Sequence, residues 1–597
     1  MSTYIRLFQA ESAYTEAREN DYLEPWVSYT EEVQRTDFNK TEYEKMREIP
    51  LTFDIVGDGI LKFVASNANF TRTIKYKKND GDWTTITSNT GDSAPTISVV
   101  NGDSIQLKGN NNTYFDGDNL WANGLCMSAS TAQFKAKGNI MSMINSTDFE
   151  NLVTFGNASG YNFYEFFCQC SALTDASMLY LPALELNYNC YGEMFAYNYS
   201  ITKAPMVLPA LQLTAGYEYG YMFAGCEYLV TAPEIKATGL SEYSLAGMFS
   251  NCIKLSKAPE LPAMTLASSC YDRMFQECTS LATAPKLPAT TMATYCYTYM
   301  FSNCNKLTTA PELPATTLAD GCYSNMFYGC YRLATVPKLP ATTLADSCYA
   351  NMFNGCSKLT SAPALPAGTL VSRCYEGMFR NCTGLTMAPI ISATTLATYC
   401  CTNMFNNCTS LTTAPELPAT TLANNCYQYM FYDCTSLTTA PALPATTLAN
   451  YCYGSMFYDC TGLTTAPALP ATTLANYCYD SMFRGCTSLT TQPVISANTL
   501  ASNCCQYMFA GCTLLTTGPV LPAGTLASRC YQGMFSACTS LNYIKAMFTT
   551  APTTGYTSNW VNGVASTGTF VKNSAATWTT TGVNAVPTGW TIETASS

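Results

Sequence analysis

Apolar residues recur along most of the chain with one fixed period. The dipeptide Met-Phe stands at Met222-Phe223 and returns in unbroken steps of 26 residues to Met534-Phe535, which makes thirteen copies. A slightly longer unit places a further copy at Met194-Phe195. A constant period of this size predicts a solenoid, in which each unit buries its apolar face against the next one.

The two halves of a unit predict different local structures. One half places apolar residues at i, i+4, i+5, i+8 and i+11, for example Cys270, Met274, Phe275, Cys278 and Leu281, and this spacing is typical of one face of a helix. The other half, LTTAPxLP, holds too much Pro and Thr for a helix and predicts a short parallel strand. Each coil is therefore expected to run through strand, Pro-rich corner and helix, as in a leucine-rich-repeat solenoid.

The segments outside the repeats predict a multi-domain chain. Residues 1–49 are rich in charge and contain LEPWVSYTEE, which predicts an N-terminal attachment arm with Leu23, Pro25, Trp26 and Tyr29 as candidate contacts. Alternating patterns such as TISVVNGDSIQLKG predict a small antiparallel β-sandwich of about seven to nine strands over residues 50–150. The solenoid is expected over 151–541, and strand-like GTFVKN and PTGWTIE predict a C-terminal β cap over 542–597.

Composition excludes several classes of function. The chain has 30 Lys and Arg against 41 Asp and Glu, a net charge of -11, so it lacks the basic surface that nucleic-acid binding requires. It contains no histidine, which rules out Ser-His-Asp and Cys-His catalysis and His-containing metal sites. No run of about 20 apolar residues and no secretory signal pattern occurs, so we expect no membrane insertion.

The 30 cysteines follow the repeat and are expected to be buried and reduced. Cys296 and Cys304 would lie ~12 Å apart along a helix, and equivalent cysteines of neighbouring helices ~8–10 Å apart, both beyond the ~7 Å Cα limit for a disulfide. No C-x-x-C knuckle is present to gather thiolates around zinc, and we expect no metal and no cofactor. Extra accessible thiols are expected only at the doubled Cys400-Cys401 and Cys504-Cys505.

Two sets of residues are candidates for a binding surface. The residue after the first Pro of LTTAPxLP should point outward, and its column alternates Glu and Lys before it becomes apolar: Glu260, Lys286, Glu312, Lys338, Ile390, Val494 and Val520. At ~4.8 Å spacing, the Glu and Lys would form a charge ladder worth at most ~1 kcal/mol per pair. The convex side carries scattered Tyr and Arg, residue types favoured at interfaces, among them Arg273, Tyr328, Arg380, Tyr432 and Tyr458. An ordinary solvated surface is the alternative interpretation of both sets.

The string F-x-x-C-x-x-L, as in Phe327 to Leu333, followed by a Pro-bounded strand, resembles the BspA-like leucine-rich repeat of bacterial surface proteins. The units here are a few residues longer than usual in that family. The phrases APALPATTLANYCY, GNIMSM and TGTFVKN, and the arm YLEPWVSYTEE, are similar to virion proteins of tailed phages that infect gut Bacteroidetes, including crAss-like phages. This resemblance covers nearly the whole chain and implies a virion fibre or receptor-binding role.

The leading hypothesis is a non-enzymatic tail or head fibre, assembled into the virion in the host cytoplasm. Its arm would contact other virion proteins, and its solenoid would bind a glycan or protein of the host surface. By family analogy it would be a trimer, although no coiled-coil heptad specifies one. The alternatives are a BspA-type adhesin on the bacterial cell surface and, less favoured, a capsule-degrading enzyme, because the repeat offers no recessed pair of carboxylates.

Overall fold

The computed structural model describes residues 40–65, 72–109, 125–155 and 160–595. The predicted arm contacts Leu23, Pro25, Trp26 and Tyr29 lie outside these ranges. The described chain divides into two compact units, Met1–Ala289 and Thr290–Ser597, and we describe each by itself. The boundaries inferred from the sequence, at residues 49, 150 and 541, stay predictions.

The first unit begins with short helices and nine strands that agree with the predicted number and antiparallel pairing. The elements are α3 (Lys40–Glu44), η2 (Lys45–Glu48), β1 (Thr52–Ile55), β2 (Gly59–Lys62), β3 (Val64–Ala65), β4 (Thr73–Lys78), β5 (Thr84–Thr87), η4 (Gly91–Ser93), β6 (Thr96–Val99), β7 (Ser104–Gly109), β8 (Leu125–Cys126), β9 (Phe134–Asn139) and η5 (Ile140–Met143). Alternate residues of β7, including Ile105 and Leu107, are buried, as expected for a strand with one face on the core.

The main sheet joins this β region to the first coil of the repeats. Its strand order is β10-β9-β1-β7-β4-β5, and β10 (Leu173–Tyr180) pairs in parallel with β9 while the other pairs are antiparallel. Tyr43 of α3 packs edge-on against Tyr180 of β10, and Met46 and Met206 belong to the same buried cluster. The first coil therefore continues a sheet of the β region, and its apolar interior is not left open at that edge.

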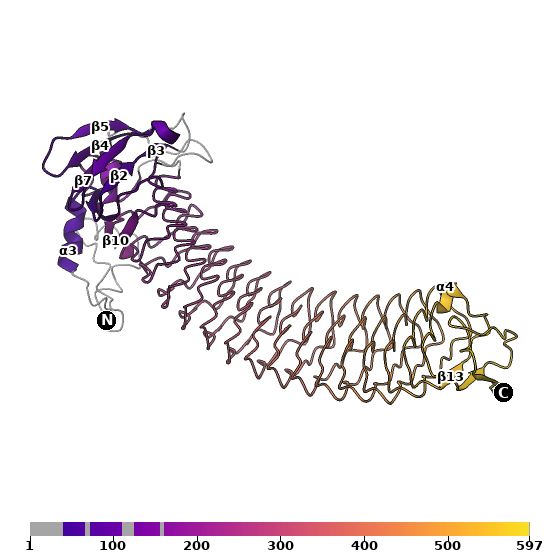
Figure 1. Ribbon diagram of the computed structural model, residues 1–597. Coiled ribbons are helices and arrows are strands. Elements are labelled where there is room, and N and C mark those ends of the chain that lie inside the picture. The colour runs from indigo at the N-terminus through magenta and orange to yellow at the C-terminus, as the bar shows by residue number, and fades with distance from the viewer. Residues whose placement is uncertain (1–39, 66–71, 110–124, 156–159, 596–597) are drawn as a thin grey trace. The chain divides into compact units, whose positions relative to one another are not determined.

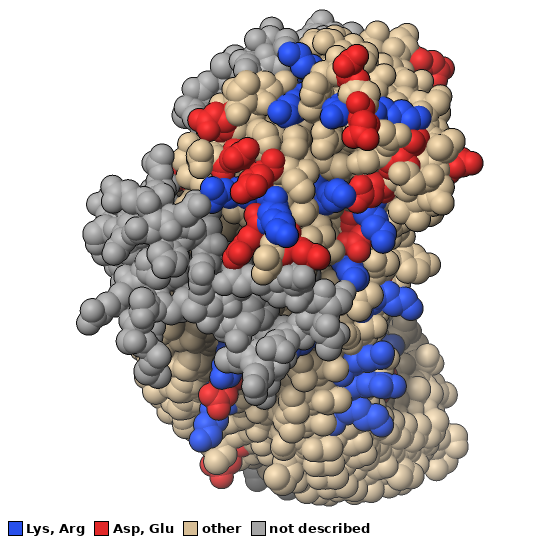
Figure 2. Space-filling view, turned by 90° about the vertical axis from the view of Figure 1, so that its left-hand side faces the viewer, with Lys and Arg blue, Asp and Glu red and all other residues tan. Residues whose placement is uncertain are grey.

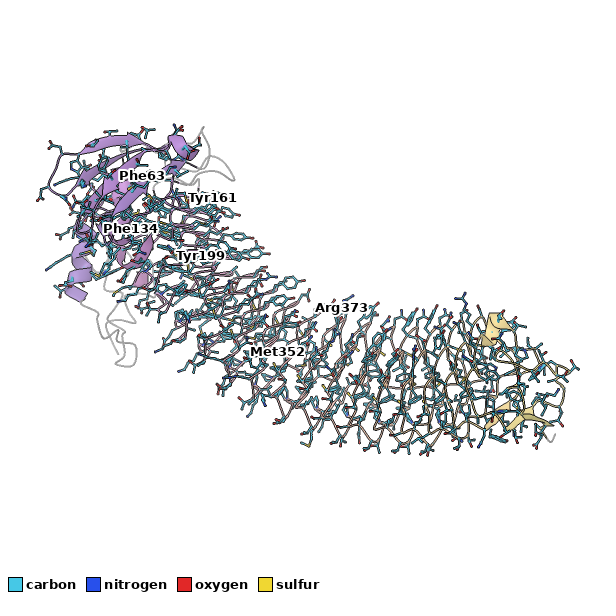
Figure 3. All side chains as sticks on the ribbon, viewed as in Figure 1. Phe63, Phe134, Tyr161, Tyr199, Met352 and Arg373 are labelled. Carbon is cyan, nitrogen blue, oxygen red and sulfur yellow. The ribbon has the colours of Figure 1, made fainter. Side chains whose placement is uncertain are left out.

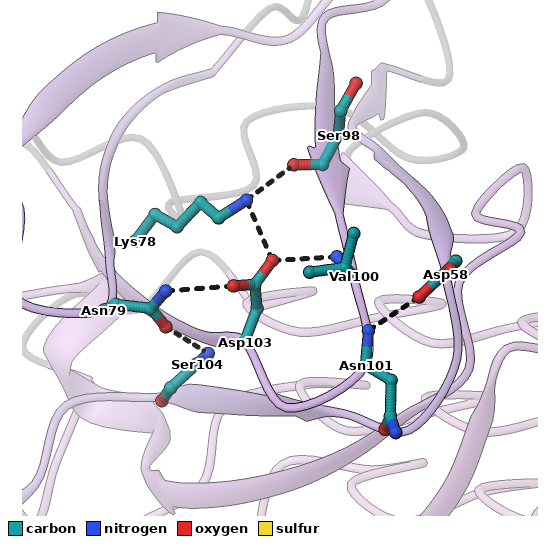
Figure 4. Close-up of polar contacts among 8 residues, drawn as sticks. All are labelled: Asp58, Lys78, Asn79, Ser98, Val100, Asn101, Asp103 and Ser104. Carbon is teal, nitrogen blue, oxygen red and sulfur yellow. Dashed lines mark hydrogen bonds and ion pairs between the residues drawn. The ribbon is translucent and has the colours of Figure 1, made fainter.

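A polar network closes the turn between β6 and β7 (Figure 4). Asp103 accepts hydrogen bonds from the backbone N–H of Val100 at 2.8 Å and from Asn79 Nδ2 at 2.9 Å, and it pairs with Lys78 Nζ at 2.8 Å. These contacts hold the pKa of Asp103 down at about 2, and the hydrogen bond from Lys78 is the largest cause.

The expected helix in each coil is wrong. Residues 160–550 are all described and contain no α-helix, and Figure 1 draws these coils as narrow loops without helical ribbon. In the second unit, Tyr295, Tyr299 and Asn303 have left-handed backbone angles, with φ of 54°, 53° and 59°. A right-handed helix cannot pass through a left-handed residue at every fourth position.

In place of a helix, these residues form consecutive turns, whose amides bond alternately to the next coil and within their own coil. The amides of Tyr297 and Phe301 donate to Cys322 O and Met326 O of the next coil at 3.0 and 2.9 Å. The amides between them close turns within the coil, as from Met300 N to Tyr297 O at 3.2 Å. We call residues 295–304 and their equivalents in other coils the turn segment. Its inward side chains recur every four residues, which differs from the 3.6-residue period of a helix.

The coils also stack more closely than helices would. Phenylalanine rings of neighbouring coils in the second unit stack with centroids 5.5 to 5.8 Å apart, so the predicted helix spacing of ~8–10 Å is wrong. Figure 3 shows Met352 within the coils and Arg373 at their rim. Met352 and Phe353 are fully buried. The interior thus contains a continuous row of phenylalanines, beside a tyrosine row that Leu245, Cys401 and Cys505 interrupt.

In most coils, isolated parallel β-bridges to the neighbouring coil take the place of the expected strand. In the first unit, β11 (Val207–Leu208) pairs in parallel with β12 (Glu234–Ile235). Elsewhere isolated parallel bridges join coils, such as Thr309 with Thr335 and Leu365 with Ile391. The two prolines of LTTAPxLP explain this, because each removes a backbone donor that a longer ladder would use.

The second unit ends in a different structure that covers the last coil. Its elements are β13 (Tyr543–Ala546), α4 (Thr554–Thr557), β14 (Thr569–Lys572) and β15 (Thr591–Thr594), and the three strands form one parallel sheet. Trp560 is fully buried, lies 6.0 Å from the Phe535 ring and donates from Nε1 to Ala585 O. The indole therefore covers the end of the phenylalanine row. No helix of the described residues is long and apolar enough to cross a membrane.

Candidate functional site

The thiols belong to the interior and offer no reactive site on the surface. All 30 cysteines lie in the described part of the chain, all are free, and all except the half-buried Cys126 are buried, as predicted. Many donate to a phenylalanine carbonyl of a preceding coil, as from Cys330 Sγ to Phe301 O at 3.0 Å. The expected accessibility of the doubled cysteines is wrong, because Cys400, Cys401, Cys504 and Cys505 are at most 1% exposed.

Burial raises the pKa of most of these thiols, for example that of Cys330 to about 12. A buried, protonated thiol is a poor nucleophile and a poor metal ligand. Among the described residues, no three Cys, Asp or Glu side chains converge where they could hold a metal ion.

The column of residues after the first Pro of LTTAPxLP points outward, as predicted. Ile390, Val494 and Val520 are 80%, 70% and 47% exposed, and the charged members Glu260, Lys286, Glu312 and Lys338 are also exposed. We call this the bridge side of the coils. The predicted charge ladder is wrong, because no described ion pair joins successive members of the column, and Glu234 of the same column pairs instead with Lys236, two residues away.

The turn segments form the other long side of the coils, and it carries the Tyr and Arg candidates. Left-handed positions such as Tyr295 and Arg373 project from the backbone, because the inward positions are filled by Cys, Tyr, Met and Phe. Tyr328 is 40% exposed and Arg380 is exposed, with buried Asn354 at the equivalent position between them. Arg273, in the first unit, pairs with Asp272 at 2.5 Å.

The structure gathers two of these candidates into a patch. The rings of Tyr432 and Tyr458, in neighbouring coils, stack with centroids 4.8 Å apart, and Arg484 lies over Tyr458 at 5.3 Å and over Tyr507 at 5.5 Å. A parallel row stacks Tyr451 on Tyr477 at 4.5 Å. We define the tyrosine–arginine patch as Tyr429, Tyr432, Tyr451, Tyr458, Tyr477, Arg484 and Tyr507.

Carboxylates lie beside the patch, and their pKa values are raised. Burial raises the pKa of Asp480 to about 6, against the opposing effects of a hydrogen bond from Ser481 and the charge of Arg484. The pKa of Asp459 is also raised, first by burial and then by Asp433 in the preceding coil. These side chains supply acceptors beside the guanidinium and phenol donors.

The comparison with known families concerns the repeats. The model of the BspA type leucine rich repeat region matches residues 219–334, 273–412, 321–438, 347–490 and 455–551. These overlapping matches extend from 219 to 551, more than half of the chain. The chain belongs to the BspA-type leucine-rich-repeat family. No curated protein matches the sequence.

One solved structure similar to this BspA-type chain is titled "Crystal structure of TLR13-ssRNA13 complex". It is 12% identical, with a TM-score of 0.22, over 73% of this chain and 58% of the other. The BspA-type chain therefore spans less than two thirds of that protein, and a likeness this slight supports no conclusion about a ligand or partner.

The first unit of the BspA-type chain carries a tyrosine row that sequence reasoning missed. Tyr188 lies edge-on to Tyr161 and Tyr217, and Tyr217 stacks on Tyr243 with centroids 4.7 Å apart. The signal was a tyrosine recurring every 26 to 29 residues from Tyr161 to Tyr243, a row that begins before the exact 26-residue period and continues into it.

The charges near the first unit's β region are mixed. In the upper part of the face that it presents, Figure 2 shows Lys and Arg interspersed with Asp and Glu. Some charges of the β region are paired, as Lys137 with Asp54 at 2.7 Å. Mixed signs of this kind create no large field of one sign over that part of the face.

Proposed function

We propose that this BspA-type chain is a non-enzymatic attachment protein of a phage virion, a tail or head fibre whose coils bind the surface of the host bacterium. The observation that carries the proposal is the tyrosine–arginine patch, in which half-buried tyrosines surround the exposed Arg484 on coils that are joined by backbone hydrogen bonds. Tyr and Arg are the residue types that most often anchor recognition surfaces.

The proposed position in the virion rests on the sequence. The arm containing Leu23, Pro25, Trp26 and Tyr29 is similar to the starts of virion proteins of crAss-like phages. In this proposal the arm contacts other virion proteins, the partner on the host is a glycan or protein, and the protein binds no nucleic acid and enters no membrane. Several copies per particle, by analogy three in each fibre, would add avidity to weak single contacts.

Binding of the full-length chain to intact gut Bacteroidetes cells, with and without capsular polysaccharide, tests attachment. Saturable binding to capsule-bearing cells is the expected result, and absence of binding to any host strain would refute it. Mass spectrometry of purified phage particles tests the location, since the proposal requires the chain to be a stoichiometric component.

A BspA-type adhesin on the bacterial surface is the alternative, and the family match favours it. The two proposals separate experimentally, because a cell-surface adhesin is found in the envelope of uninfected bacteria and is missing from phage particles. Fractionation of both with one antibody would decide between them.

One observation bears on the third alternative, a capsule-degrading enzyme. Tyr164 Oη donates to Glu193 at 3.0 Å, and burial, followed by the charge of Glu193, raises the pKa of nearby Glu165. Two carboxylates with separated pKa values are the usual requirement for glycoside hydrolysis. Release of reducing sugar from host capsule by the full-length chain, and its loss in Glu165→Gln, would favour the enzyme. Our proposal expects no release.

A further inference from the structure

Two tyrosine rings position the guanidinium of Arg484, and its N–H groups make no hydrogen bond to the described protein. It lies between the rings of Tyr458 and Tyr507, at 5.3 and 5.5 Å from their centroids. Among the described residues its side chain makes no ion pair or hydrogen bond, although it is exposed. A guanidinium stacked between two rings is fixed in orientation, so its planar set of N–H donors is available to a ligand at little entropic cost.

A row of asparagines beside the patch also presents donors. Asn424 Oδ1 accepts from Asn450 N at 3.1 Å, and Asn450 Oδ1 accepts from Asn476 N at 3.2 Å, and Asn476 Oδ1 continues the row. All three side chains are exposed. Because each amide oxygen is engaged by the next coil, each NH₂ group remains available as a donor.

Aspartate carboxylates supply hydrogen-bond acceptors beside these donors, and they outnumber the one positively charged side chain of the patch. Asp433, Asp459 and Asp480 lie beside the patch, so three carboxylates accompany the single guanidinium of Arg484. This excess of negative charge opposes polyanions such as uronic-acid polymers and nucleic acids. It does not oppose an uncharged ligand.

The tyrosines present edges and hydroxyls more than faces. The interplanar angles of 15° for Tyr432–Tyr458 and 7° for Tyr451–Tyr477 show that each ring covers its neighbour. The solvent-facing groups are therefore phenol hydroxyls, which both donate and accept. These hydroxyls recur at the spacing of the coils, a periodicity that a polymer with a repeating unit can share.

We propose that the tyrosine–arginine patch binds a neutral polysaccharide that lies along successive coils, with Arg484 and the asparagine row donating to sugar hydroxyls and the three aspartates accepting from them. Sugar hydroxyls are donors and acceptors at once, so a surface that alternates both kinds matches them. A polymer with a repeating unit gains avidity from a surface that repeats. This inference rests on the proposed attachment function and names its ligand class.

The test compares full-length variants for binding to immobilised neutral polysaccharides (a glucan, a mannan and a galactan), to uronic-acid polymers (alginate and hyaluronan) and to intact host cells. Tyr458→Ala and Arg484→Ala are expected to weaken binding to at least one neutral polymer by roughly tenfold or more. Arg484→Lys keeps the charge and loses the planar donor set, so it should resemble Arg484→Ala. Tyr331→Ala is the matched control, an exposed tyrosine outside both the patch and the turn segments, and should bind like the parent.

Unchanged circular dichroism and melting temperature confirm that the variants fold. The proposal is overturned if the parent binds only uronic-acid polymers, or if both patch variants bind neutral polymers like the parent. Cell binding that survives protease treatment of the cells and is lost in the patch variants supports a glycan, and cell binding abolished by protease points to a protein and overturns it. Failure of the parent to bind any cell refutes the attachment function itself, a result distinct from parent-like variants.

Discussion

Left-handed backbone at every fourth residue determines the shape of each coil in this protein. Asn and Gly tolerate this conformation best, and they occupy many of these positions, as at Asn351 and Gly355 with φ of 53° and 82°. Tyrosines of the tyrosine–arginine patch also occupy them, as at Tyr451 and Tyr477, both with φ of 56°. The positions that shape the backbone thus also carry the side chains that we assign to binding.

Gly355 and Gly368 test this backbone requirement within one repeat. Gly355 has φ of 82°, whereas Gly368 has an ordinary φ and no atom within 4 Å of an added Cβ. Gly355→Val should destabilise the chain by about 2 kcal/mol, because a β-branched residue is strained in the left-handed region. Gly368→Val should change stability by no more than about 0.5 kcal/mol. Denaturant unfolding of the two full-length variants measures both, and equal losses would contradict the requirement.

Asp103 should make the β region sensitive to acid in a defined range. Its pKa is lowered to about 2 in the folded state. A depressed pKa stabilises the fold at pH above the unfolded value near 4, and this contribution is lost as the pH falls from about 4 toward 2. Protection factors for hydrogen exchange, corrected for the intrinsic rate at each pH, should therefore fall in β4 and β7 over this range, and Asp103→Asn should remove that part of the pH dependence. An unchanged acid profile in Asp103→Asn would show that other groups cause it.

At the scale of the element, each coil is stabilised by identical rows and not by a helix or a strand. Phe405 lies between Phe379 and Phe431, with centroids 5.8 and 5.6 Å away, and is fully buried. The neighbouring backbones hydrogen bond through every second amide of the turn segment. Burial and lateral bonding together replace the stability that a helix gains from its own hydrogen bonds.

Truncating a side chain of the buried phenylalanine row should destabilise the protein far more than truncating one on the bridge side. Phe405→Ala should cost about 3–5 kcal/mol, because it opens a cavity in the row. Ile390→Ala removes a side chain that is 80% exposed and should cost less than about 0.5 kcal/mol. Unfolding midpoints of the two variants check this. A large loss in Ile390→Ala would mean that the bridge side is covered in solution.

The sequence predicted the period, the buried rows and the outward column, because these depend only on the alternation of apolar and polar residues. It did not predict the turn segment, since Cys296, Met300 and Cys304 fit a helix face almost as well as a period of four. The distinguishing signal is the recurrence of Asn and Gly four residues apart, as at Asn325 and Gly329, with φ of 56° and 71°. The patch was missed as a unit because stacking of Tyr432 on Tyr458 depends on the close spacing of coils, and the predicted helices implied a wider one.

At the scale of the whole molecule, each unit has a covered edge beyond its repeats. In the first unit, β10 continues the sheet of the β region through β9, and in the second unit Trp560 and the sheet β13–β15 cover the last coil. Solenoids need such ends because a terminal coil otherwise exposes its core. Within the coils of the second unit, the bridge side and the turn side are the two long surfaces, and we assign attachment to the turn side.

Hydroxyl-radical footprinting of the full-length chain, alone and bound to host envelope vesicles, tests that assignment most directly. We predict that binding protects Tyr432, Tyr458 and Tyr477 from oxidation while the exposed Met387 and Tyr331 react as in the free chain. Protection of Met387 on the bridge side, with the patch tyrosines unchanged, would contradict it.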